Sequence, residues 1–353
     1  PVIDNVENSK TQSFYLGTYT DKDSKGIYKY SIDSVGILKE IGLVAYSNNP
    51  SFLALSTDKK YLLAVNEVNE DSTGFIESFE IKGDSLEIIN KSPSGGANPC
   101  FVAINEKGYV LVANYTGGNV GLLKLNNNGE LSSLLDLSQH EGKGITERQE
   151  APHAHSAWFD KQDNTKVVAV DLGTNELWFS QIDPNSDKFI PSEKLAMAEG
   201  AGPRHLAFHP NKKYVYVLNE LDNTISMVQK SEGENYVIKQ TISTLPEGFL
   251  EFSKGADIHV SNDGKFVYSS NRGHDSIAIF SVNTINGNLT LLGFESTKGK
   301  NPRNFSLSTD ENYLIVANQN SDNLISFKRN KETGLLSFVS EIKAPTPVCI
   351  LFN

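Results

Sequence analysis

Arginine is scarce in this chain, and its placement suggests that the protein binds an anion. The 353 residues include 32 Lys and Arg together, of which only five are arginine: Arg148, Arg204, Arg272, Arg303 and Arg329. Lysine instead fills polar turns such as Lys59-Lys60 and Lys212-Lys213. A guanidinium offers a rigid planar fork that suits a carboxylate or a phosphate, whereas lysine is a flexible point charge. Where the fold gathers the arginines, we therefore expect a small anionic ligand.

Three histidines add a capacity to move protons. His153 and His155 stand two residues apart, and His205 directly follows Arg204. Histidine is the side chain most easily tuned to proton transfer near neutral pH. A pair at this spacing could also hold a metal, but no further ligands follow at a fixed spacing, so we predict no metal site. Taken singly, each histidine could equally be structural.

Seven copies of one pattern must position these side chains. Each copy begins near a proline or a glycine, and successive anchors lie 45 to 53 residues apart: Pro50, Pro99, Pro152, Pro203, Gly255, Pro302 and Pro347. Within a copy, two alternating apolar runs flank a turn rich in Asp, Asn, Gly and Lys, and two shorter runs follow, such as 75–81 and 86–89. Alternation bounded by turn residues predicts strands, and four strands per repeat of this length are typical of a β-propeller.

The two chain ends predict how the ring closes. Residues 347–353 supply the first strand of a copy and stop, whereas residues 14–19, 26–32 and 37–43 match the other three strands. We therefore expect an all-β, seven-bladed β-propeller with four antiparallel strands per blade. Its last blade would be shared by both chain ends, with the C-terminal strand innermost, which spares the sheet an open edge. Residues 13–353 would form this single domain, and residues 1–12 a loose polar tail.

In a propeller the first strand of each blade lines the central channel, so its start and the end of the second strand meet at one channel mouth. The residue after each anchor predicts one ring at this mouth: Ser51, Cys100, His153, Arg204, Ala256, Arg303 and Val348. The residue that closes each second strand predicts another: Tyr19, Glu67, Tyr115, Leu172, Glu220, Arg272 and Gln319. An Asn or Asp recurs just before this second ring, and we expect it to hydrogen-bond loop backbone.

Arg204 and Glu220 start and end one hairpin, and residue 212 at its turn is equally far from both. We therefore expect them to lie side by side, with the arginine keeping the pKa of the carboxyl low. The carboxylate could then act as a general base while the arginine binds substrate charge. The alternative is that the arginines form structural ion pairs with Glu67, Glu220 and Asp257. The polar insertion 141–150 could overhang the mouth.

Composition excludes several classes of function. The net charge is 32 − 43 = −11, which disfavours nucleic acid as a partner. No apolar run reaches the roughly 20 residues of a membrane span. Cys100 and Cys349 lie in apolar runs, so we expect buried reduced thiols and a cytoplasmic protein, or an exported one if a signal peptide precedes Pro1. We expect a monomer or a weak homodimer.

Short segments at the ends of the inner strands together form a specific pattern. They are residues 97–100, 114–118, 152–155, 202–206, 218–220, 257–261, 270–272 and 301–305. This pattern resembles the 6-phosphogluconolactonase and carboxymuconate cyclase family of seven-bladed β-propellers, and the resemblance covers essentially the whole chain.

The resemblance implies a cofactor-free enzyme that acts on a lactone ring. The counterparts of the catalytic groups proposed for the cyclase branch are His155, Arg204 and Glu220, with His153 as the alternative to His155, and Arg272 matches a further substrate-binding arginine. In a hydrolase, Glu220 or His155 would activate a water and Arg204 would stabilise the oxyanion. The predicted substrate-binding residues are His153, His205, Arg272, Arg303 and Glu67, and the arginines among them would hold a phosphate or carboxylate.

Three functions remain open at this point. The favoured one is hydrolysis of a small anionic sugar lactone, with 6-phosphogluconolactone converted to 6-phosphogluconate. The second is a carboxymuconate-type lactonising cyclase. The third is a non-catalytic propeller that binds a protein or a sugar. The third is disfavoured because the Trp-Asp and Gly-His repeat signatures of the common interaction propellers are absent and ionisable residues gather at the channel.

Overall fold

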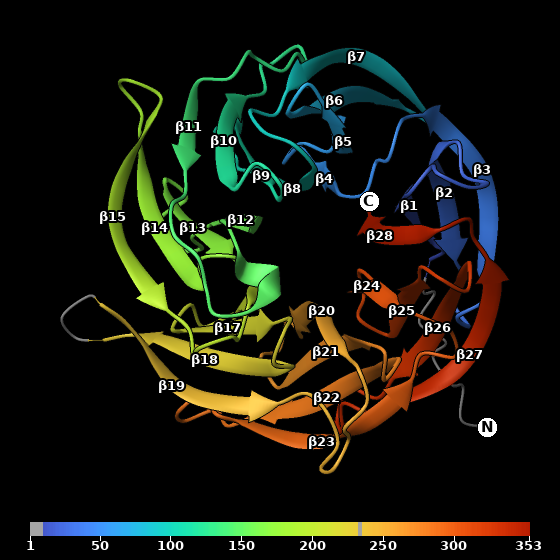
Figure 1. Cartoon of the computed structure of the whole chain (residues 1–353). Coiled ribbons are helices and arrows are strands. Elements are labelled where there is room, and N and C mark those ends of the chain that lie inside the picture. The colour runs from blue at the N-terminus through green and yellow to red at the C-terminus, as the bar shows by residue number, and fades with distance from the viewer. Residues whose placement is uncertain (1–9, 232–234) are drawn as a thin grey trace.

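The structure is a computed structural model that describes residues 10–231 and 235–353. Across these residues, 28 strands form seven four-stranded antiparallel sheets set as blades around a common axis (Figure 1). The predicted seven-bladed propeller is therefore confirmed. Most of the predicted loose tail, residues 1–12, lies outside the described residues, and the first strand, β1, begins at Gln12.

Six blades are built from consecutive strands, with the first strand of each blade at one edge of its sheet, nearest the axis. The first three are β4 (Leu53–Leu55), β5 (Tyr61–Glu70), β6 (Thr73–Lys82), β7 (Ser85–Pro93); β8 (Pro99–Ile104), β9 (Tyr109–Asn114), β10 (Asn119–Lys124), β11 (Asp136–Gln139); and β12 (Ala154–Phe159), β13 (Lys166–Asp171), β14 (Glu176–Asp183), β15 (Lys188–Ala196). The next three are β16 (Pro203–Phe208), β17 (Tyr214–Asn219), β18 (Thr224–Lys230), β19 (Tyr236–Ser243); β20 (Lys254–Val260), β21 (Phe266–Arg272), β22 (Ser276–Val282), β23 (Leu289–Ser296); and β24 (Pro302–Leu307), β25 (Tyr313–Asn318), β26 (Asn323–Arg329), β27 (Leu336–Lys343).

The seventh blade joins the two ends of the chain. Its strand order is β28-β1-β2-β3, formed by β28 (Pro347–Phe352), β1 (Gln12–Thr18), β2 (Gly26–Ile32) and β3 (Leu38–Tyr46). The C-terminal strand β28 runs antiparallel to β1, with Leu351 opposite Tyr15, and lies innermost (Figure 1). The predicted closure of the ring is confirmed.

The hydrophobic core is divided among the blade interfaces. Seven clusters of buried apolar side chains occur in the described part of the chain, each between two neighbouring blades. Because each sheet packs against a neighbour on both faces, second strands such as β9 and β25 are buried along their whole length. This two-sided burial holds the inner strand ends in place around the axis.

A buried asparagine at the end of the second strand ties the inner hairpin to the preceding loop. The Nδ2 groups of Asn66, Asn114, Asn271 and Asn318 donate to loop carbonyls at 2.7 to 3.0 Å. The prediction that this repeated residue bonds loop backbone is confirmed for these four, whereas Nδ2 of Asn219 donates to the hydroxyls of Thr224 and Ser226, both at 3.0 Å. One 3-10 helix, η1 (Glu147–Gln149), precedes β12, and no helix in the described residues is long and apolar enough to cross a membrane.

Candidate active site

A β-bulge near the start of the inner strand decides which side chains face the channel. In the β16 blade, Pro203 pairs with Asn219 and His205 with Leu218, so Arg204 is the extra residue. The same register makes Cys100 the extra residue in β8 and Arg303 in β24. A bulge locally turns the strand and re-aims a side chain, which explains why these residues share one ring.

The β12 blade contributes His155 to that ring, not His153 as the proline anchor predicted. In the β12 blade, Ala154 pairs with Asp171 and Ser156 with Val170, so His155 holds the bulge position. The residue at the end of the second strand, here Asp171, sets the register. Its partner Ala154 is the equivalent of Pro203, so the anchor Pro152 lies two residues before the start of the bulge pattern. His153 instead lies at the rim. Its Nδ1 is 3.0 Å from the Tyr115 carbonyl and its Nε2 is 3.1 Å from Glu150.

Glu220 gathers three of the five arginines. Its carboxylate lies 3.1 Å from Nε of Arg204, 3.2 Å from Nη2 of Arg272 and 3.3 Å from Nη2 of Arg148. Glu220, Arg204 and Arg272 are buried, whereas the Arg148 side chain is 44% exposed. The expected contact between Arg204 and Glu220 is confirmed. The alternative reading, in which the arginines form ion pairs with carboxylates, also holds at Glu220.

The charge of Glu220 follows from these neighbours. Burial alone would raise the pKa of its carboxyl, but Arg272, Arg204 and Arg148 outweigh burial and lower the pKa to about 2. A carboxylate held this firmly is a weak acceptor for a proton. Its clearest effect is to fix three guanidiniums at one side of the channel mouth.

Arg148 is a member of this cluster that the predicted site residues did not include. It lies in η1, within the insertion between β11 and β12, and also donates to the hydroxyl of Tyr115 at 2.9 Å. Figure 1 shows this segment crossing towards the axis of the ring, so the predicted overhang of residues 141–150 is confirmed. The signal available in the sequence was the scarcity of arginine, which sets Arg148 apart in a polar loop.

Glu67 forms a second cluster three blades away around the ring. It accepts hydrogen bonds from the hydroxyls of Tyr19, at 2.8 Å, and Ser51. Nη2 of Arg303 lies 3.9 Å from Glu67, and its guanidinium lies over the Tyr19 ring at 5.3 Å from the centroid. The mouth thus carries a second carboxylate with an arginine near it.

His155 is buried below the mouth. Its Nδ1 lies 3.6 Å from Sγ of Cys100. Burial, with Arg204, His205 and Arg303 nearby, holds the pKa of His155 well below its usual value, so the imidazole is neutral near pH 7. The predicted buried thiols are confirmed, because Cys100 and Cys349 are both buried and free.

A second layer lies one residue deeper, where His205, Asp257 and Asn304 meet. Asp257 accepts from Nδ1 of His205 at 3.0 Å and from Nδ2 of Asn304 at 2.8 Å. Asp257 thus pairs with histidine, and the alternative of a structural ion pair between an arginine and Asp257 is not seen among the described residues. Between the two layers is a cavity of about 10 Å³, lined in part by Ser51, Cys100, His155, Arg204, His205 and Arg303. That volume is about what one water needs, so a sugar-sized ligand must bind above it, at the mouth.

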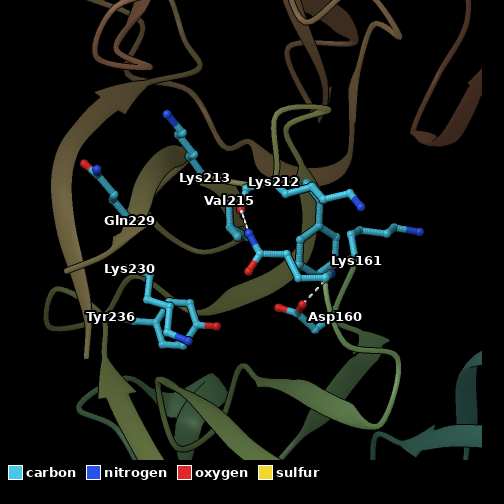
Figure 2. Close-up of a pocket in the computed structure, with 10 residues that line it drawn as sticks. Asp160, Lys161, Lys212, Lys213, Val215, Gln229, Lys230 and Tyr236 are labelled. Atoms are coloured by element: carbon cyan, nitrogen blue, oxygen red, sulfur yellow. Dashed lines mark hydrogen bonds between the residues drawn. The ribbon is translucent and has the colours of Figure 1, made fainter. Parts of the chain in front are cut away.

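A larger hollow lies away from the channel, between the blades of β12–β15 and β16–β19. It measures about 300 Å³ and is lined by lysines such as Lys161, Lys212 and Lys213 (Figure 2). The described residues that line it include no histidine. Their one carboxylate, Asp160, accepts from the amides of Gln162 and Asp163. Because acid-base groups gather in the channel and not here, we place the candidate active site at the channel mouth.

The predicted residues thus fall into four places. Arg204, Glu220 and Arg272 form one cluster, Glu67 and Arg303 form another, and His155 and His205 line the cavity between the layers. His153 stands apart at the rim. Within residues 10–231 and 235–353, no three His, Cys, Asp or Glu side chains converge as a metal site requires. The arrangement can bind negative charge and hold a water beside a neutral imidazole.

Comparisons with known proteins agree with this architecture. The model of the family described as "Lactonase, 7-bladed beta-propeller" matches residues 13–352. A 6-phosphogluconolactonase of Bacillus subtilis is 39% identical over 345 residues, covering 96% of this chain and 97% of the relative. A 6-phosphogluconolactonase of Formosa agariphila is 33% identical over 338 residues, covering 91% of this chain and 94% of the relative.

Solved structures show the same fold. The periplasmic gluconolactonase of Pseudomonas aeruginosa superimposes with a TM-score of 0.92 at 27% identity, covering 97% of this chain and 99% of that one. A protein of Lactobacillus plantarum also gives a TM-score of 0.92, at 32% identity, covering 97% of this chain and 99% of that one.

Proposed function

This chain belongs to the family of seven-bladed β-propeller lactonases, and on that basis we propose that it hydrolyses a small anionic sugar lactone, with 6-phosphogluconolactone as the favoured substrate. Relatives named 6-phosphogluconolactonase and gluconolactonase support a lactonase. The observation that carries the choice of an anionic substrate is the convergence of arginines at the channel mouth.

The charge balance of the mouth favours a negatively charged substrate. Arg148, Arg204, Arg272 and Arg303 face two carboxylates there, those of Glu67 and Glu220. Two positive charges are therefore left over, on a chain whose net charge is −11. Guanidinium groups bind phosphate through paired, charge-assisted hydrogen bonds. Arg148 is the most exposed of the four, so it is the first that a phosphate entering the mouth would meet.

Lactone hydrolysis needs an activated water and positive charge for the oxyanion. We assign the oxyanion to Arg204, which lines the cavity, and the phosphate of the substrate to Arg148 and Arg303 at the mouth. In this scheme Glu220 holds the arginines in place. The product is the ring-opened hydroxy acid.

The test is hydrolysis of freshly generated 6-phosphogluconolactone and of glucono-1,5-lactone, each against its spontaneous rate. We expect acceleration of both, with the lower KM for the phosphorylated lactone. Arg148→Ala should raise that KM by about tenfold, the loss of one charge-assisted contact of roughly 1.4 kcal/mol. The matched control is Lys143→Ala, which removes one positive charge from the same insertion at an exposed position and should leave KM unchanged.

Folded protein that accelerates neither lactone would overturn the proposal. Muconate-type acids would then be the next substrates to assay, because the same arginines suit a dicarboxylate. Acceleration of both lactones with equal KM values would retain the lactonase and reject the phosphate site.

A further inference from the structure

His205 is a buried histidine whose two ring nitrogens have different surroundings. Nδ1 lies 3.0 Å from Oδ1 of Asp257, whereas Nε2 is buried and has no hydrogen-bond partner among the described residues. The residue is 3% exposed. A carboxylate beside Nδ1 holds the neutral imidazole with its proton on that nitrogen, which leaves the lone pair of Nε2 free.

Asp257 is itself held firmly in place. Its Oδ2 accepts from Nδ2 of Asn304 at 2.8 Å and from Nε2 of His259 at 3.0 Å. The amide of Asn304 is fixed in turn, because its Oδ1 accepts from the backbone N–H of Ile350 at 2.7 Å. Groups from β16, β20 and β24 therefore meet at this carboxylate, and β28 orients one of them. In hydrolases, a carboxylate that orients a histidine in this way allows the histidine to act as the base that activates the nucleophile.

The surroundings of His205 suit an enclosed water. The side chain lines the cavity of about 10 Å³, together with His155, Arg204 and Arg303. The rings of Phe52 and Phe101 flank the imidazole, with centroids 5.9 and 5.6 Å away. A water in this cavity would have polar partners on one side and an apolar wall on the other.

The two other candidates for the base are less well placed. Glu220 is bound by three guanidiniums at 3.1 to 3.3 Å. His155 has one ring nitrogen 3.6 Å from the thiol of Cys100, and no carboxylate of the described residues hydrogen-bonds to its ring. His205 is the histidine that combines a carboxylate partner, an unengaged nitrogen and a place on the cavity wall.

We propose that His205 is the general base of the lactonase, with Asp257 as its positioning residue, and that the hydrolytic water occupies the adjoining cavity. This inference rests on the proposed lactone hydrolysis. The water gives a proton to Nε2 while its oxygen bonds to the carbonyl carbon, and the carbonyl π pair moves onto the oxygen that faces Arg204. When the intermediate collapses, that pair re-forms the carbonyl, the ring C–O bond breaks and the ring oxygen takes the proton from Nε2. One water is consumed for each lactone opened.

The test compares the wild type with His205→Gln, His205→Ala and Asp257→Asn, using 6-phosphogluconolactone and glucono-1,5-lactone. General acid-base groups contribute about 10²- to 10⁴-fold, so we expect His205→Gln to lower kcat at least about 100-fold with KM within about threefold. Added imidazole should restore part of the activity of His205→Ala. It should not restore Asp257→Asn, where the histidine is still present but misoriented.

His209→Gln is the matched control. His209 follows β16 in the same blade, and its Nε2 lies 2.9 Å from the carbonyl of Gly264, outside the cavity lining. This variant should keep kcat within about twofold. Circular dichroism would establish that each variant is folded.

Several outcomes would overturn the role of His205. These are a His205→Gln variant within about threefold of wild-type kcat, a change in KM alone, or no response of His205→Ala to imidazole. If the variants do not fold, a high-resolution crystal structure of the wild type decides: a water within hydrogen-bond distance of Nε2 supports the role, and an empty or apolar contact there rejects it. Wild-type protein that opens neither lactone would instead overturn the proposed function itself, and this role with it.

Discussion

Glu220 shows how burial and neighbouring charge set the chemistry of one residue. It is 2% exposed, and three guanidiniums contact its carboxylate. A buried charge is tolerated when it is paired, and removing one partner leaves the others uncompensated. In this molecule the carboxylate therefore acts as the counter-ion that allows Arg148, Arg204 and Arg272 to stand together.

We expect Glu220→Gln to lower the free energy of unfolding by about 3 kcal/mol near pH 7, because three arginines lose their counter-ion. The pKa of Glu220 falls from 4.5 to about 2 on folding, so its contribution is complete above the unfolded pKa. It is lost as pH falls from 4.5 towards about 2. Urea unfolding of the wild type and Glu220→Gln near pH 7 and near pH 3 measures this difference in the free energy of unfolding.

The exposed Glu247→Gln is the control and should change stability by less than about 0.5 kcal/mol. A wild-type-to-variant difference that stays constant between the two pH values would contradict the assignment.

At the scale of elements, the bulged inner strand and the clasp blade position the site. The bulge presents Arg204, His155 and Arg303 in one ring, and the next residue in each strand belongs to a deeper layer. The clasp supplies the N–H of Ile350 that orients Asn304. Close packing of β1 against its neighbours keeps the ring of bulge residues and the clasp strand in position.

Gly17 in β1 tests that packing. A β-carbon there would collide with the carbonyl oxygen of Pro50 and lie 3.2 Å from Cβ of Cys349. We expect Gly17→Ala to lower the free energy of unfolding by about 1–3 kcal/mol, the usual cost of overpacking. Gly293→Ala in β23 is the matched control, because nothing lies within 4 Å of its added β-carbon. Equal unfolding midpoints for the two variants in urea would show that β1 can shift at no cost.

At the scale of the whole molecule, the ring depends on its closure by β28. Val348, Cys349 and Ile350 are all buried, and Cys349 and Ile350 pack into the two clusters on either side of the clasp blade. Without β28, the inner edge of β1 would be open and two blade interfaces would lose apolar contacts. Exposed edges of this kind also promote association between chains.

Typical domains have a free energy of unfolding of about 5–15 kcal/mol, and we expect a chain that ends after Thr346 to lose most or all of it. We expect a truncated protein that is unfolded or aggregated at 25 °C, measured by circular dichroism and light scattering. Removal of Asn353 alone, an exposed residue, is the control and should leave the thermal midpoint within about 2 °C. A truncated chain that melts with the wild type would show that six blades and three strands suffice.

The sequence by itself determined the architecture and part of the site. Its sevenfold repeat and complementary ends predicted the propeller and its clasp, because blades repeat at a near-constant length and each end completes the other. The hairpin symmetry predicted that Arg204 meets Glu220, since strand pairing is local. The pairing within this hairpin was predicted correctly.

Only the tertiary structure decided which side chains share a layer. The structure places His155, and not His153, in the ring of bulge residues. The reason is that the pairing with Asp171 at the strand end, and not the proline, sets the register of the bulge. The structure also brought Arg148 to Glu220 from an insertion in another blade, and it joined His205, Asp257 and Asn304 across three blades. Such contacts depend on how neighbouring blades pack and where each strand bulges, and a repeat pattern along one chain encodes neither.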